Sequence, residues 1–155
     1  MFPQAAGPGP PHQACVARLS GTEDLAYDGP VLNAAPPIAF VSTTDPERAR
    51  AFYQDTLGLT FVADEGFALV FDLAGVMLRV TRVDELQPQP FTVLGWRVDD
   101  PEETVRGLTG RGVAFERFPG MEQDALGIWR SPSGASIAWF RDPDGNVLSI
   151  TRFQR

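Results

Sequence analysis

Residues 139–150 read WFRDPDGNVLSI. Apolar and β-branched residues flank a central Pro-Asp-Gly-Asn, and this pattern predicts two strands joined by a tight turn. Proline presets φ for a turn, whereas glycine and asparagine tolerate positive φ within it. We interpret the stretch as the closing hairpin of the fold, with strands expected at 136–140 and 146–153. Such a turn indicates the fold and predicts no chemistry of its own.

Outward from this hairpin, one pattern of elements occurs twice. Each copy has a strand followed by Asp-Pro-Glu, which supplies a helix N-cap, a proline at the first helical position and an acid near the positive end of the helix dipole. The capping aspartates, Asp45 and Asp100, are 55 residues apart (100 − 45). The pattern predicts two βαβββ modules, 38–84 and 91–153, that share one core. The other strands are expected at 38–42, 59–63, 67–72, 76–83, 91–98 and 113–117.

Residues 1–37 have a different composition. They hold seven of the fourteen prolines and only two aromatic residues, Phe2 and Tyr27. Because such a stretch buries too little apolar surface to offset its ordering entropy, we expect a disordered or loosely packed tail. The only histidine and the only cysteine, His12 and Cys15, lie in this tail. We interpret them as incidental residues of a flexible arm rather than as a metal or nucleophile pair.

The residue counts exclude several classes of protein. After residue 15 the chain has no cysteine, histidine or lysine, which excludes cysteine proteases, Ser-His-Asp triads, lysine Schiff bases and Cys/His zinc sites there. The net charge of −7 and the scattered arginines predict no nucleic-acid partner. No apolar run approaches the ~20 residues of a membrane span, and residues 1–20 lack the pattern of a signal peptide. We therefore expect no membrane partner and a cytoplasmic protein.

The motifs resemble those of a known family. The segments TTDPERARAFYQDTLGL (43–59) and VDDPEETVRGLTGRGV (98–113), with the closing WFRDPDGNVLSI, resemble the glyoxalase/bleomycin-resistance/dioxygenase superfamily, also called the vicinal oxygen chelate (VOC) fold. The resemblance covers residues 38–153. It implies an α+β fold in which the two modules form a glyoxalase-like cup, and a homodimer in which modules pair across two chains.

The resemblance also places metal ligands on four strands of metal-dependent members. Those positions fall here on Ile38, Arg79, Val93 and Ser149. None of these side chains is a good ligand for a divalent metal, and a shift of one residue along each strand does not supply better ones. We therefore expect no catalytic metal in the cup and no cofactor.

Strand alternation predicts which side chains line the cup. They are mostly apolar, with a few hydroxyls and two arginines: Ile38, Phe40, Ser42, Met77, Arg79, Thr81, Val93, Gly95, Arg97, Val147, Ser149 and Thr151. Arg79 and Arg97 either hold an anionic or carbonyl-bearing ligand or pair with acids at the rim. We expect Trp96 and Trp139 to lie in the core.

The second module has a long segment, 118–130, that the first lacks, and long loops are often functional. Its acids and aromatics either contact a ligand or transfer a proton, or form a solvated loop with Trp129 packed as a plug. The candidate ligand-binding residues are Phe40, Met77, Arg79, Val93, Arg97, Glu122, Asp124, Trp129 and Ser149.

These observations favour a metal-independent protein that binds a small molecule. The leading hypothesis is bleomycin-resistance-like sequestration of a drug or metabolite in the cup. The alternative is a VOC enzyme: a glyoxalase-type lyase, a ring-cleaving dioxygenase, or a metal-free acid/base enzyme that uses the 118–130 loop. The sequence leaves open whether the protein catalyses a reaction.

Overall fold

The first module forms one four-stranded mixed sheet in the computed structural model, which describes residues 29 and 31–154. The strand order is β1-β4-β3-β2, with β1 parallel to β4 and the other neighbours antiparallel. Asp45 caps the helix, since its carboxylate accepts a hydrogen bond from the Arg48 backbone N–H. The elements are β1 (Ile38–Thr43), α1 (Pro46–Arg50), the π-helical segment η2 (Ala51–Thr56), β2 (Thr60–Asp64), β3 (Ala68–Leu73) and β4 (Val76–Arg82).

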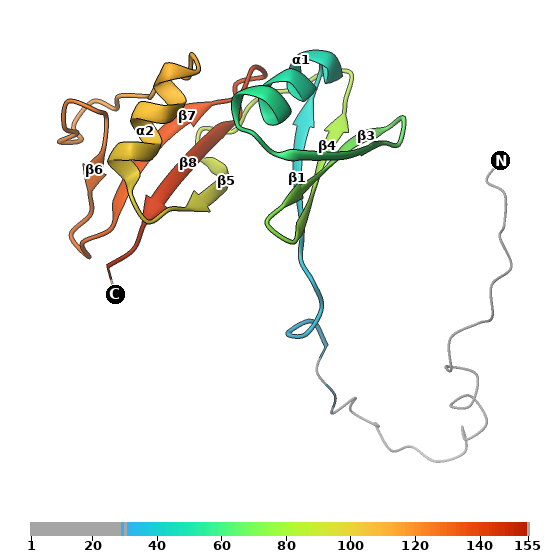
Figure 1. Cartoon of the computed structure of the whole chain (residues 1–155), viewed down its shortest axis with the longest axis horizontal. Coiled ribbons are helices and arrows are strands. Elements are labelled where there is room, and N and C mark those ends of the chain that lie inside the picture. The colour runs from blue at the N-terminus through green and yellow to red at the C-terminus, as the bar shows by residue number, and fades with distance from the viewer. Residues whose placement is uncertain (1–28, 30, 155) are drawn as a thin grey trace, which may run out of the picture. The chain divides into compact units, whose positions relative to one another are not determined.

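The second module repeats this connectivity with strand order β5-β8-β7-β6. Asp100 caps its helix through the Glu103 backbone N–H. Figure 1 shows this helix lying across β7 and β8. The elements are β5 (Thr92–Arg97), α2 (Pro101–Gly110), β6 (Trp129–Arg130), β7 (Ser136–Arg141) and β8 (Val147–Arg152). The predicted α+β fold of two βαβββ modules is confirmed.

The strand expected at 113–117 is wrong. Only an isolated bridge joins Phe115 to Phe140, and the strand that pairs with the outer edge of β7 is the two-residue β6. The Gln123 side chain explains the difference, because it donates to the Glu116 carbonyl and accepts from the Phe118 N–H. These are backbone groups that a longer strand would use for its ladder.

One core joins the two modules. Tyr53 and Phe71 from the first module and Phe140 and Leu148 from the second are fully buried in it. Trp96 stacks on the Phe140 ring at 6.2 Å and packs against this core, as expected.

Trp139 departs from the prediction that it lies in the core. Its register partner is Ser149, whereas the next residue, Phe140, pairs with Leu148 and faces the core. Because successive strand residues face opposite sides of a sheet, Trp139 lies on the face that points away from the helices.

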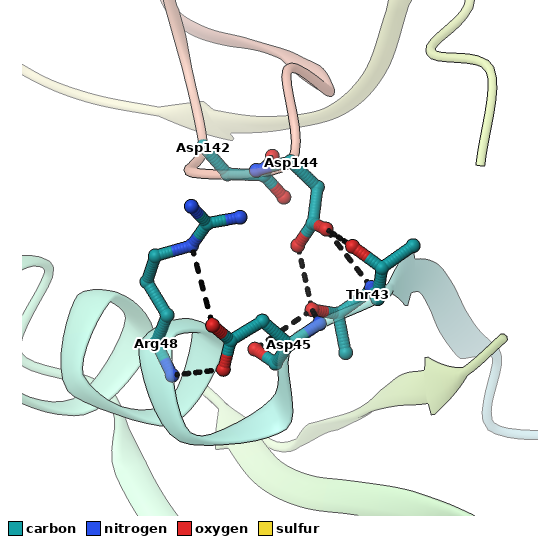
Figure 2. Close-up of polar contacts among 6 residues, drawn as sticks. Thr43, Asp45, Arg48, Asp142 and Asp144 are labelled. Atoms are coloured by element: carbon teal, nitrogen blue, oxygen red, sulfur yellow. Dashed lines mark hydrogen bonds and ion pairs between the residues drawn. The ribbon is translucent and has the colours of Figure 1, made fainter. Parts of the chain in front are cut away.

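The turn of the closing hairpin fastens the second module to the first. Figure 2 shows this turn facing the start of α1. Asp144 accepts hydrogen bonds from the Thr43 hydroxyl at 2.6 Å and from the Thr44 backbone N–H at 2.9 Å. Beside it, the buried Asp142 accepts from the Tyr53 hydroxyl at 2.7 Å. The turn therefore fixes where the two sheets lie within the 36–154 unit.

The predicted tail, 1–37, lies mostly outside the described residues, as do His12 and Cys15 within it. Residues 31–35 contain a turn that the Ala35 N–H closes on the Leu32 carbonyl at 3.0 Å. The disorder expected for the tail stays a prediction.

Candidate functional site

The first sheet presents an open apolar face on the side opposite its core. Register pairs Ile38 with Met77 and Phe40 with Arg79, so these four side chains share one face, as alternation predicts. Their strand neighbours, such as Leu78 and Val80, are fully buried on the other side. The exposed fractions of Ile38, Phe40 and Met77 are 50%, 59% and 42%. We call these three residues with Arg79 the first-sheet face.

Arg79 is held in place on this face by an acid, an aromatic ring and a sulfur. Its Nη2 forms an ion pair with the Glu65 carboxylate, and its guanidinium lies 5.0 Å from the centre of the Phe67 ring. Its Nη1 contacts the Met77 sulfur at 3.8 Å. Of the two roles expected for Arg79, the structure shows the ion pair with an acid at the rim of the cup. An anionic ligand would therefore have to compete with Glu65 for the guanidinium.

The second sheet offers fewer open groups than the sequence suggests. Ser149 is only 6% exposed, and a Cβ built on Gly95 would lie 2.7 Å from its Oγ, so the serine fills the space against β5. Val93 lies at a register shift between Thr92 and Leu94 and packs against the core. Arg97, at the end of β5, is exposed. Among these candidates, Arg97 alone presents an open polar group.

Three aromatic side chains form a wall on the outer face of the second sheet. Trp129 lies 6.1 Å from Trp139, which in turn meets Phe118 edge to face at 5.5 Å. The Trp139 Nε1 donates to the Thr92 hydroxyl at 3.1 Å. Trp129 therefore packs as a plug against Trp139, which was one of its two expected roles. Strict alternation from the core residue Phe140 would have placed Trp139 in this wall.

The 118–130 loop is ordered by its own polar side chains. The Asp124 Oδ1 accepts from the backbone N–H groups of Leu126 and Ile128, both at 2.9 Å. The Gln123 amide also donates to the Gly127 carbonyl at 2.8 Å. Sequence reasoning missed Gln123, which contacts both ends of the loop. Glu122 is exposed and makes no hydrogen bond to the described residues. Of the two loop acids, Asp124 shapes the turn and Glu122 faces solvent.

The four strand positions that the resemblance assigns to a metal do not suit one. Ile38 and Val93 carry no donor atom, Arg79 carries a positive charge, and the weak Ser149 hydroxyl is packed against Gly95. Zinc and the other catalytic transition metals are held mainly by imidazole, thiolate or carboxylate ligands. Within residues 31–154, no three His, Cys, Asp or Glu side chains gather in a metal-binding group.

Comparison with known proteins settles the family. A family model described as the Glyoxalase/Bleomycin resistance protein/Dioxygenase superfamily matches residues 36–150. The chain belongs to this superfamily. The match runs from before β1 into β8, the last strand of the second module. A search of the curated proteins finds no match.

Solved structures share the superfamily fold at low sequence identity, and each comparison speaks to the fold alone. They include a glyoxalase/bleomycin resistance protein/dioxygenase from Alicyclobacillus acidocaldarius (TM-score 0.57, 18% identity, 79% of this chain and 93% of that one). A lactoylglutathione lyase from Agrobacterium tumefaciens is also similar (0.57, 20%, 78% and 98%). So is the fosfomycin resistance protein FosX from Listeria monocytogenes (0.60, 15%, 76% and 92%). No helix among the described residues is long and apolar enough to cross a membrane.

Proposed function

We propose that this chain is a metal-independent small-molecule-binding protein that sequesters a drug or metabolite in its cup, as a bleomycin-resistance protein does. The observation that carries the proposal is the first-sheet face, where three large apolar side chains stay open beside an anchored arginine. Ligand sites are mostly apolar with a few fixed polar groups, and this face has that composition. Cytoplasmic location stays a prediction.

We propose that a second copy of the chain covers the first-sheet face and so completes the cup. The described residues of one chain leave the first-sheet face uncovered, while the Phe118, Trp129 and Trp139 wall lies on the second sheet. In a homodimer the wall of one chain covers the first-sheet face of the other. Large aromatic side chains suit this role because they bury much area and have few rotatable bonds.

Oligomeric state and ligand binding test the proposal together. Phe40→Asp places a charge in the first-sheet face, and we expect it to turn a dimer into a monomer in sedimentation analysis. Phe91→Asp is the matched control, because Phe91 has the same exposed fraction, 59%, but precedes β5 and lies outside that face. A wild-type chain that stays monomeric at all concentrations, or equal effects of the two substitutions, would overturn the dimer.

A thermal-shift screen tests sequestration. The screen uses bleomycin, other cationic glycopeptides and aromatic metabolites with the full chain. A ligand present at 100 times its Kd should add about 2.7 kcal/mol to the free energy of unfolding. Phe40→Asp should abolish this gain and Phe91→Asp should keep it. Sequestration also requires that the compound is recovered chemically unchanged. A compound that raises the melting temperature equally in both variants does not bind the proposed face.

A metal-free acid/base enzyme is the second candidate, and Glu122 is the residue that favours it. A general base needs a free carboxylate near the substrate, and Glu122 is the loop acid that is not used in hydrogen bonds with the described residues. Turnover of a glutathione hemithioacetal after exhaustive chelation, lost in Glu122→Gln, would support this candidate over sequestration. Turnover that requires added metal would contradict both.

A further inference from the structure

Several arginines in the described part of the chain form no ion pair with an acid. Arg97, Arg130 and Arg152 have no carboxylate partner among residues 31–154. Arg50, Arg111, Arg117 and Arg130 donate to neutral oxygens, Arg130 to the Ser136 hydroxyl at 3.5 Å. The arginines that pair with an acid are Arg48, Arg79, Arg82, Arg106 and Arg141. Arg97 and Arg152 differ from all of these, because their guanidinium groups form neither an ion pair nor a hydrogen bond with residues 31–154.

Arg97, Arg130 and Arg152 lie at the same end of the second sheet. Each is the last residue of its strand: Arg97 of β5, Arg130 of β6 and Arg152 of β8. Register places Arg97 opposite Thr151, and both Arg130 and Arg152 opposite Ser136. Because successive residues of a strand face opposite sides of the sheet, Arg97, which pairs with Thr151, leaves the sheet on the side opposite to Arg152. The two side chains share only the hollow at the strand ends, which both of them line. Arg130 lies two strands from Arg152, since β7 separates β6 from β8.

A hollow of about 720 Å³ opens between these strand ends. Its lining residues are Arg97, Val98, Asp99, Arg152, Phe153 and Gln154. A smaller hollow of about 110 Å³ shares Arg152 and Gln154 with it and extends to Arg130. Two guanidinium groups and one carboxylate give the larger hollow a net charge of +1 (2 − 1). The hollow therefore attracts a negatively charged ligand.

An apolar hollow adjoins the charged one. It has a volume of about 220 Å³ and shares Arg97 and Val98 with the larger hollow. Its other walls are mostly apolar and include Leu57, Leu108 and Trp96. A molecule with its acid group beside Arg97 would thus have a non-polar compartment next to that group.

We propose that this end of the second sheet is a binding site for an amphiphilic carboxylic acid. The carboxylate lies between Arg97 and Arg152, which suit it because guanidinium groups bind carboxylates through paired N–H donors. The apolar body of the ligand fills the hollow beside Trp96. The site goes beyond the proposed cup: Arg97 borders two of the hollows, but no other predicted cup-lining residue, Phe40 and Met77 included, borders any of the three.

Titration of the full chain with octanoate tests the site. The readout is the indole N–H signal of Trp96 in an ¹⁵N-correlation spectrum, with Trp129 and Trp139 as internal references. We expect octanoate to shift the Trp96 signal with a Kd of about 1 mM or below. Acetate has the carboxylate without the long alkyl chain, and octylamine has the alkyl chain with a positive charge. Both should leave the Trp96 signal unchanged.

Variants locate the carboxylate. Arg97→Gln and Arg152→Gln should each weaken octanoate binding about tenfold, since a charged hydrogen bond is lost. Arg106→Gln is the matched control, because Arg106 is an exposed arginine of α2 that lines none of the hollows. Circular dichroism verifies that each variant is folded. Phe40→Asp should bind octanoate normally, which separates failure of this site from failure of the cup.

Several results would overturn the proposal. One is octanoate binding that is equally strong in Arg97→Gln, Arg152→Gln and Arg106→Gln. Another is a response to octylamine equal to that to octanoate, which would indicate apolar partitioning without charge recognition. A shift of Trp129 with no shift of Trp96 would place the ligand in the cup instead.

Discussion

Replacing Tyr53 by phenylalanine removes one hydroxyl from the junction between the modules. Tyr53 is fully buried, and its hydroxyl donates to Asp142 Oδ2 at 2.7 Å. Burial, together with the nearby Asp142 carboxylate, raises the pKa of Tyr53 well above its ordinary value, so the phenol stays protonated and donates. The same Asp142 oxygen also accepts from Asn146 Nδ2 at 2.8 Å, so the carboxylate keeps a partner after the substitution.

The expected cost follows from this geometry. A hydrogen bond to a charged group contributes about 1.5–3 kcal/mol, so we expect Tyr53→Phe to lower the free energy of unfolding by about 2 kcal/mol. That corresponds to a melting temperature roughly 8 °C lower for a domain of this size. Asp142→Asn should cost about 3 kcal/mol, because an amide cannot accept from both Tyr53 and Asn146 while also accepting from the backbone N–H groups of the turn.

A double-mutant cycle in urea measures the link. Because both single substitutions remove the same bond, Tyr53→Phe with Asp142→Asn should cost about 1–2 kcal/mol less than the sum of the two. Asp72→Asn is the control, since the exposed Asp72 caps a turn in the first module only. A Tyr53→Phe cost below about 0.5 kcal/mol, or additive single costs, would refute the view that this bond holds the modules together.

Two further substitutions test the turn of the closing hairpin and the packing of β5 against β8. Burial alone would raise the pKa of Asp144, but hydrogen bonds from Thr43 and Thr44 and the charge of Arg48 outweigh it and lower the pKa. The ionised form of Asp144 therefore stabilises the fold above the unfolded-state pKa of about 3.9. Asp144→Asn should lower the free energy of unfolding most at neutral pH, and this loss should shrink as pH falls through the folded-state pKa. Urea titrations at several pH values measure the loss, and a loss that does not depend on pH would contradict the argument. Gly95→Ala should lower the free energy of unfolding by about 1–3 kcal/mol, because the added Cβ would lie 2.7 Å from the Ser149 Oγ. Adding Ser149→Ala should recover part of this loss in thermal melts. A Gly95→Ala variant as stable as the wild type would show that β5 can move away from β8.

The sequence predicts the fold well because its signals are local. The capping aspartates, the Asp-Pro-Glu openings and the turn at 142–146 each act within a few residues, and the Asp-Pro-Glu opening occurs in both modules. The expected strand at 113–117 fails for a reason that is not local. Its backbone groups are taken by the Gln123 side chain, several residues further on, and an apolar pattern carries no information about that competition.

The candidate site is predicted less well, because side-chain partners depend on how turns place them. The pairing of Arg79 with Glu65 requires the β2–β3 turn to lie beside β4. The sequence predicted, as one of two roles for Arg79, an ion pair with an acid at the rim of the cup, but it did not indicate which acid. The sequence suggested Asp124 as an acid available to a ligand, but its carboxylate accepts a hydrogen bond from the Ile128 backbone N–H within the same loop. The hollow at Arg97 and Arg152 is formed by strand ends and by residues after them, which alternation along one strand does not describe.

A cup without metal donors must obtain its affinity from another source, and the first-sheet face indicates which. Glu65 already pairs with Arg79 and is 40% exposed, so exchanging it for a ligand anion adds little, since exposed ion pairs contribute about 0–1 kcal/mol. Covering apolar surface contributes about 25 cal/mol per Å², and roughly 200 Å² over Ile38, Phe40 and Met77 would supply about 5 kcal/mol. Apolar contact therefore outweighs charge on this face. A ligand of the cup should be selected by shape and apolar area, whereas selection by charge belongs to the arginines at the end of the second sheet.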